Sequence, residues 1–191
     1  MNGSWTLVTA PAVEPVTLAD VKLHLRITGS AEDSTLALYV QMAREAVEQE
    51  CWRALLPQTW DLFLSAWPLD GIVHIPRPPL QSVTHLRYTD ADGVQATYPA
   101  GNYLVDTASE PGRLVLAPRC TWPSVTLTTA NPIVLRFVAG YVNAASVPAV
   151  IRAAILLGVG DIYANREAAA SDKLELTETV KNLLSLARVR Y

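Results

Sequence analysis

The chain has 191 residues, of which 50% are apolar and 17% are charged, and its formal net charge at pH 7 is −3. This length and apolar content suffice for one domain with a hydrophobic core, or for one domain that carries an insertion. The small negative charge excludes a general binder of nucleic acid or membrane surfaces, because such proteins carry excess positive charge. The charged fraction is below the ~25% of typical soluble domains, which favours a subunit partly covered by neighbours.

Two helices are predicted in the first third of the chain. Thr17 is followed three residues later by Asp20, which is typical of a capped helix start, and residues 30–33 (Ser-Ala-Glu-Asp) give a second such signal. The second helix extends to about Cys51. Its buried stripe is predicted from the three-four spacing of apolar residues: Leu36, Tyr39, Val40, Ala43, Val47 and Cys51. Its solvated side is predicted to hold Gln41, Arg44, Glu45, Glu48 and Gln49, with an ion pair between Arg44 and Glu48 one turn apart.

Residues 57–140 have the period-two alternation of short antiparallel strands. The predicted strands are 58–66, 72–75, 82–89, 94–98, 102–106, 113–116 and 133–139. Asp90-Ala-Asp-Gly93 is a hairpin-turn sequence, and residues 110–112 give another turn signal. Between two of the strands, Arg77 lies in a stiff Pro-Arg-Pro-Pro run. It is either an exposed arginine on a sheet edge or a side chain that a rigid loop offers to a neighbour.

A third helix is predicted from Pro148 to Ala164, and it is apolar on nearly every side because its only charges are Arg152 and Asp161. It is too short to span a bilayer, which needs ~20 apolar residues. Gly158 and Gly160 within it cost about 1 kcal/mol each relative to alanine, so close packing is expected there. This helix is therefore predicted to be the central post of a helical core or of a subunit contact.

A final amphipathic helix is predicted over residues 177–188, after a loop at 168–172. The order of elements predicts an α+β fold: a small α-helical bundle core, with two helices before and two after, carries an inserted antiparallel β-module. The predicted parts are 1–56 (N-terminal helical part), 57–140 (inserted β-module), 141–170 (central helix) and 171–191 (C-terminal helix and tail).

No catalytic, metal-binding or cofactor-binding residue is predicted. His24, His74 and His85 have no ligand spacing to one another, and Cys51 and Cys120 form no metal motif, so buried reduced thiols are expected. Asp90 and Asp92 are too few oxygen ligands for a calcium site and are attributed to the chemistry of a turn. Glu45 and Glu48 have no histidine at the spacing of a carboxylate metal site and are attributed to a solvated helix face. Three aromatic residues are expected in the core or at a sheet edge, with interface anchoring as the alternative: Trp67, Tyr103 and Trp122.

Several segments, taken together in their order and spacing, carry a family resemblance. They are residues 17–26, 57–60, 75–83, 88–93, 139–141 with 147–148, and the apolar helix that ends in Asn165-Arg-Glu167. This series resembles the head–tail connector (adaptor) family of long-tailed bacteriophages, which also occurs in prophages and gene transfer agents. The resemblance covers residues 14–167.

The resemblance implies a structural protein rather than an enzyme. Members of this family form a ring, commonly of twelve subunits, under the portal protein in the neck of the particle. The ring joins the DNA-filled head to a stopper or tail-terminator protein, and DNA passes through its lumen without sequence-specific binding. No cofactor and no membrane contact are implied, and the ring is assembled in the bacterial host cytoplasm.

We expect the basic C-terminal helix to dock on the portal. The residues predicted to do so are Lys181, Leu183, Leu184, Arg188, Arg190 and Tyr191. Deleting residues 177–191 is expected to abolish portal binding and to leave the fold intact. The alternative function is a DNA-packaging accessory or DNA-binding module, which would need a basic surface. A third candidate, a small metal-dependent hydrolase, would need a ligand cluster that the sequence lacks.

Overall fold

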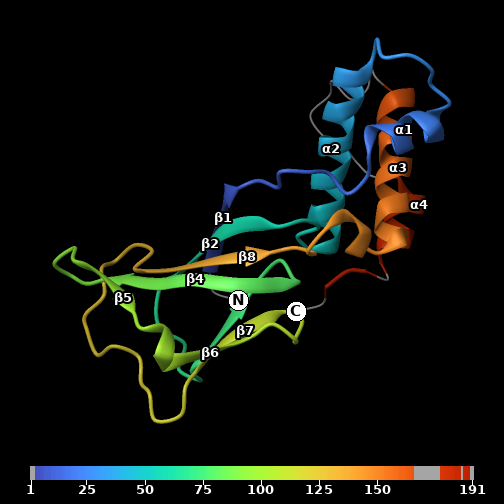
Figure 1. The fold of residues 1–191 in the computed structure, drawn as a ribbon. Helices are drawn as coiled ribbons and strands as arrows, with labels where there is room; N and C mark the ends of the chain where they lie inside the picture. The colour runs from blue at the N-terminus through green and yellow to red at the C-terminus, as the bar shows by residue number, and fades with distance from the viewer. Residues whose placement is uncertain (1–2, 166–176, 186, 190–191) are drawn as a thin grey trace. The chain divides into compact units, whose positions relative to one another are not determined.

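A computed structural model describes residues 3–165, 177–185 and 187–189, and it shows an α+β fold, which confirms the predicted class. The described chain divides into two compact units. We call residues 3–11 and 57–140 the β unit, and residues 12–56 together with the described residues from 141 onward the helical unit. Figure 1 shows the elements of both units along the chain.

The helical unit contains α1 (Leu18–Leu25), α2 (Asp33–Cys51), α3 (Ala149–Ala164) and α4 (Glu178–Leu184), with a short 3₁₀ turn, η2 (Ala144–Ser146). α3 contacts each of the other three helices, and so does α2. Fully buried apolar side chains from all four helices form one core; they include Val21, Leu36, Val47, Ile151, Ile155, Val180 and Leu184. Burial of this apolar surface is the main stabilisation of the unit.

The starts of α1 and α2 differ in their chemistry. α1 has the predicted capping box: the Thr17 hydroxyl accepts a hydrogen bond from the backbone N–H of Asp20 (3.1 Å), and the Asp20 carboxylate accepts one from the Thr17 backbone (2.9 Å). The predicted cap of α2 at Ser30 is wrong, because α2 begins at Asp33 after Glu32 and has no side-chain cap. α4 is shorter than the predicted helix, and the predicted loop at residues 168–172 lies outside the described residues.

The β unit contains two antiparallel sheets. One has the strand order β1-β2-β8-β4-β5 and the other the order β3-β7-β6. The strands are β1 (Gly3–Thr9), β2 (Gln58–Leu64), β3 (Ile72–Ile75), β4 (Leu80–Thr89), β5 (Gln95–Tyr98), β6 (Tyr103–Asp106), β7 (Gly112–Leu116) and β8 (Ile133–Ala139), with a 3₁₀ turn, η1 (Ala100–Asn102), before β6. β1 was not predicted. Residues 3–9 were expected in the N-terminal helical part, but they pair with β2, with Trp5 opposite Leu62.

The core of the β unit is built by alternate residues of its central strand. In β8, Ile133, Leu135 and Phe137 are fully buried, as the period-two pattern predicts. A cluster of aromatic rings packs in the same unit: Trp67, Tyr88, Tyr98, Tyr103 and Trp122. Its tightest pair is Trp67 stacked on Trp122, with ring centroids 4.6 Å apart. The predicted core or sheet-edge positions of Trp67, Trp122 and Tyr103 are therefore confirmed.

Two aspartates organise turns of the β unit. The Asp90 carboxylate accepts hydrogen bonds from the backbone N–H groups of Asp92 (3.0 Å) and Val94 (2.8 Å), which confirms the predicted hairpin turn between β4 and β5. The Asp106 carboxylate, at the end of β6, accepts hydrogen bonds from Arg113 (2.7 Å) and from the backbone N–H of Ala108 (3.0 Å). Each carboxylate thus accepts two hydrogen bonds that hold its turn in place.

Acidification is expected to release the Asp106 turn. The hydrogen bond from Arg113, followed by the bonds from residues 108 and 109, holds the pKa of Asp106 well below its usual range. Because the pKa is lowered in the folded state, the stabilisation is present above the unfolded pKa of about 3.9 and is lost as the pH falls toward the folded value. A carboxyl titration by NMR should therefore place the Asp106 midpoint below that of an unfolded peptide, and Arg113→Gln should move it upward. A midpoint that Arg113→Gln leaves unchanged would contradict this assignment.

Candidate interaction surfaces of the helical unit

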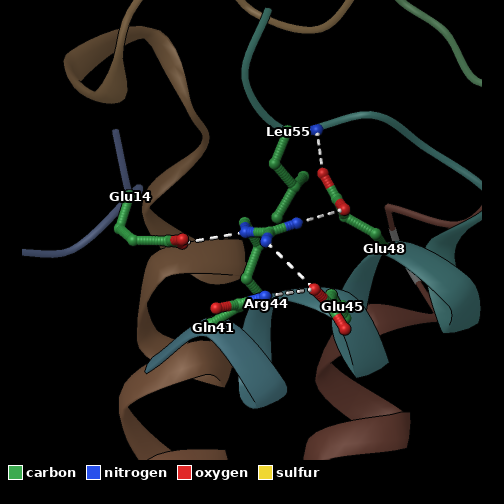
Figure 2. A network of polar contacts seen from close by, with 6 residues as sticks. All are labelled: Glu14, Gln41, Arg44, Glu45, Glu48 and Leu55. Carbon is green, nitrogen blue, oxygen red and sulfur yellow. Dashed lines mark hydrogen bonds and ion pairs between the residues drawn. The ribbon is translucent and has the colours of Figure 1, made fainter. Parts of the chain in front are cut away.

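A buried polar network surrounds Arg44 on α2 (Figure 2). The Arg44 guanidinium donates hydrogen bonds to Glu48 (2.8 Å), Glu14 (2.8 Å) and Glu45 (3.3 Å). The predicted ion pair between Arg44 and Glu48 is confirmed, but their predicted place on a solvated face is wrong. Arg44 is only 4% exposed and Glu48 only 5% exposed. Arg44 and Glu48 therefore form a buried ion pair that packs inside the helical unit, not a surface salt bridge.

The network fastens two loops to α2. Glu14 lies in the segment that precedes α1, and Leu55 lies in the segment that follows α2. The second carboxylate oxygen of Glu48 accepts a hydrogen bond from the backbone N–H of Leu55 (2.8 Å), as Figure 2 shows. One guanidinium thus serves three carboxylates, and the network has a net charge of −2. Burial raises the pKa of Glu14, and attraction to Arg44 opposes this shift only in part.

A groove of about 410 Å³ lies between α1 and α3. We call it the α1–α3 groove; its lining includes Val16, Asp20, Leu23, His24, Arg152 and Leu156. Leu23 is 81% exposed, although leucine side chains on helices normally face a core. Leu23 was not among the residues predicted to form a site. The available signal was that Leu23 departs from the three-four spacing of Leu18, Val21 and Leu25.

Arg152 is the cation of this groove. The Nε atom of its side chain is buried and has no hydrogen-bond partner among the described residues. The charge of Arg152 acts on Asp20, which also accepts the hydrogen bonds from Thr17, and these bonds lower the pKa of Asp20 more than Arg152 does. The groove is therefore apolar over most of its lining and carries one positive charge, that of Arg152.

The residues predicted to dock on the portal do not form one exposed surface. Lys181 lies 3.0 Å from Glu178 on the same helix, and Arg188 has a half-exposed side chain 3.5 Å from Glu50. Leu183 is half-buried. Leu184 is fully buried in the core, so its inclusion in a docking surface is corrected: it stabilises the helical unit. The other two predicted residues, Arg190 and Tyr191, lie outside the described residues.

The C-terminal segment also contributes to the fold. The backbone N–H of Val189 donates to the carbonyl of Cys51 (3.0 Å), and Arg53 donates to the carbonyl of Ala187 (2.7 Å). Val180 and Leu184 are both fully buried. Deletion of residues 177–191 would therefore open the core and remove these bonds. The expectation that this deletion leaves the fold intact is wrong.

The residues considered for chemistry lie apart. His24 lines the α1–α3 groove, His74 lies on β3, and His85 lies opposite Arg136 across β4 and β8. In the part of the chain that the structure describes, no three His, Cys, Asp or Glu side chains gather where they could hold a metal ion. Across the same residues, no helix is long and apolar enough to cross a membrane.

The two thiols and Arg77 have ordinary packing roles. Cys51 is buried, and burial raises the pKa of its thiol to about 11. Cys120 is only half-buried, so the prediction of two buried thiols holds for Cys51 alone. The Arg77 guanidinium lies 5.3 Å from the centroid of the Trp60 ring and is half-buried. Because of this cation–π contact Arg77 is not simply an exposed edge residue, and its presentation to a neighbour stays a prediction.

Comparison with known proteins gives similarities over most of the chain. Residues 15–92 match the family model described as "Phage gp6-like head-tail connector protein". A chain of the structure "Virion of native gene transfer agent (GTA) particle" is 25% identical, with 98% of this chain and 96% of that chain covered and a TM-score of 0.77. The structure "Neck of empty GTA particle computed with C6 symmetry" gives the same values. "Neck of native GTA particle computed with C12 symmetry" is 24% identical, with a TM-score of 0.76 and the same coverage. No curated protein matches the sequence.

Proposed function

We propose that this chain is a member of the phage gp6-like head–tail connector family, whose model matches residues 15–92, and that it is a structural connector subunit in the neck of a phage or gene transfer agent particle. The observation that carries this proposal is the similarity over 98% of the chain to a protein of the gene transfer agent virion, at a TM-score of 0.77. The similarity includes both the helical unit and the β unit, because nearly the whole chain is covered.

In this function the copies form a ring, commonly of twelve subunits, between the portal protein and a stopper or tail-terminator protein. Two similar structures are particle necks computed with C6 and C12 symmetry, and such symmetry is what a ring of identical subunits produces. A contact between two different surfaces of the same subunit repeats around an axis and closes into a ring when the rotation permits. The ring assembles in the host cytoplasm and remains in the neck of the particle.

DNA passes through the lumen of the ring, and the subunit performs no chemical step. The net charge of −3 supports this function, because a wall that neutralises few phosphates leaves DNA free to slide. The alternative, a DNA-packaging accessory or DNA-binding module, predicts salt-dependent binding of DNA by the free protein. We expect no such binding in an assay over a range of salt concentrations.

The C-terminal segment docks on the portal through its basic side chains, of which Arg188 is exposed and Lys181 is half-buried. Lys181 and Arg188 carry this contact, together with Leu183 and the residues Arg190 and Tyr191 that follow the described part. The contact is separate from the core function of Leu184. It is therefore tested with charge substitutions rather than with a deletion.

Electron microscopy of particles made with and without this protein tests the function. Without it, heads should fill with DNA but remain tailless, because the portal has no connector for the tail. Restoring the intact gene on a plasmid should restore tailed particles. Tailed, DNA-filled particles formed in the absence of the protein would overturn the proposal.

A further inference from the structure

The outward side of α3 has an unusual composition for a helix that faces solvent. Its exposed residues are Ala149, Ala153, Leu157 and Ala164, and no charged residue lies between Arg152 and Asp161. Leu23 of α1 extends this apolar surface beside the α1–α3 groove. Solvent-facing sides of helices normally hold charged and polar residues, and contiguous exposed apolar patches mark protein interfaces. This side of the helical unit therefore has the composition of a covered surface.

The α1–α3 groove also carries a positive charge, on Arg152, that an acidic partner would complement. The buried Nε of Arg152 lacks an acceptor within the described chain. Asp20, the acid beside it, is held in the capping box with Thr17. Arg26, at the end of α1, is exposed. A partner that fits must bring an apolar side chain for Leu23 and a negatively charged group for Arg152.

α2 presents both features on its own exposed side. We call Ser34, Leu38, Gln41, Glu45 and Gln49 the α2 outer face. Leu38 is 54% exposed, and the Glu45 side chain is 52% exposed. Glu45 belongs to the network of net charge −2 around Arg44. Leu38 and Glu45 are seven residues apart, so they lie on one side of the helix about 10 Å apart.

We propose that the α2 outer face of one subunit docks in the α1–α3 groove of the next subunit in the ring. Leu38 packs against Leu23 and Leu156 of the neighbour, and Glu45 binds Arg152. This inference rests on the proposed function, since it assigns the contact that closes the ring. Within the helical unit, Figure 1 shows α2 on one side and the pair of α1 and α3 on the other. Because the two surfaces are different, the contact is heterologous and repeats from subunit to subunit.

Cysteine cross-linking in purified particles tests the contact. In a Cys120→Ser background, the chain carries Leu23→Cys and Leu38→Cys, and particles are oxidised and analysed on a non-reducing gel. Docking places the two cysteines of neighbouring subunits close enough for a disulfide. A ladder of covalent multimers is expected, at a yield at least about tenfold above the control. The control replaces Leu38→Cys with Leu69→Cys, a fully exposed position in the β unit.

A charge exchange provides a second measurement that does not depend on disulfide geometry. Arg152→Glu and Glu45→Arg should each reduce the yield of tailed particles, because each places like charges across the contact. The double variant should restore the yield. Circular dichroism and a thermal melt of each purified variant establish that it folds.

Two outcomes separate this inference from the proposed function. A neck that contains a ring of this chain, with cross-linking at the control level and no rescue by the double variant, overturns the docking of α2 in the groove and leaves the connector function standing. A wild-type particle whose neck contains no ring of this chain overturns both.

Discussion

Arg44→Ala is expected to destabilise the helical unit by about 3–5 kcal/mol, the usual cost of removing one partner from a buried ion pair. The substitution leaves Glu48, which is 5% exposed, without a cation while it still accepts the hydrogen bond from Leu55. It also frees Glu14, so the segment that precedes α1 loses its attachment to α2. Urea unfolding followed by the helical circular dichroism signal measures the loss.

The destabilisation caused by Arg44→Ala should also depend on pH. Without Arg44, the buried carboxyl of Glu48 and the half-buried carboxyl of Glu14 have no cation beside them, so their folded pKa values should exceed the unfolded value of about 4.3. A raised folded pKa means that stability is highest below the unfolded pKa and falls as the pH rises through the folded pKa. The gap between the variant and the wild type should therefore narrow on acidification.

A matched control separates charge from packing. Arg44→Met combined with Glu48→Gln removes both charges, while the glutamine oxygen can still accept the bond from Leu55. This variant should recover the part of the loss that comes from Glu48, since replacing a buried ion pair is often nearly neutral, while Glu14 stays without its cation. A loss below about 1 kcal/mol for Arg44→Ala alone would show that the pair behaves like a surface salt bridge, against its observed burial.

The sequence identified the elements whose signals are local. The capping residues Thr17 and Asp20 mark the start of α1, and the apolar run after Pro148 marks α3. The bounds of β8 follow from its strict alternation, since every second residue from Ile133 to Ala139 is buried. Each of these signals depends on neighbours within one or two turns of the chain, so no knowledge of the tertiary fold was needed.

The sequence did not identify features that depend on distant segments. β1 is stabilised by pairing with β2, nearly fifty residues further along, and its seven residues give no helical or turn signal of their own. In the sequence pattern of α2, Arg44 and Glu48 lie on the polar side of the helix. They are buried because the segments around residues 14 and 55 cover that side. Periodicity describes one helix, whereas burial depends on what covers it.

The same limit applies to the candidate interaction surfaces. A basic tail is visible in the sequence, but the burial of Leu184 within that tail depends on packing against the rest of the helical core. Leu23 and Leu38 are ordinary leucines in the sequence, and their exposure becomes informative only after the core is known. In an amphipathic helix, a leucine that lies outside the buried stripe is therefore the first sequence signal to consider for a binding surface.

Leu184→Ala is expected to destabilise the helical unit by about 2–5 kcal/mol, because it removes a fully buried side chain and leaves a cavity in the core. Leu183→Ala, on the same short helix but half-buried, should cost distinctly less in the same unfolding measurement. Both variants replace a leucine of α4 with alanine, and the two leucines differ in how deeply their side chains are buried. Equal losses would contradict the assignment of Leu184 to the core.

Charge substitutions at Lys181 and Arg188, compared with Leu184→Ala, separate the effect on folding from the effect on docking in the C-terminal segment. Lys181→Glu combined with Arg188→Glu should leave the unfolding free energy within about 1 kcal/mol of the wild type, because exposed ion pairs contribute little to stability. If the basic side chains contact the portal, this variant should lose portal binding in a pull-down while it remains folded. Leu184→Ala should then lose portal binding only in proportion to the unfolded fraction, and low temperature or stabilising osmolyte should restore it. Retained binding by the folded charge variant would remove the docking proposal and leave the structural role of α4 unaffected.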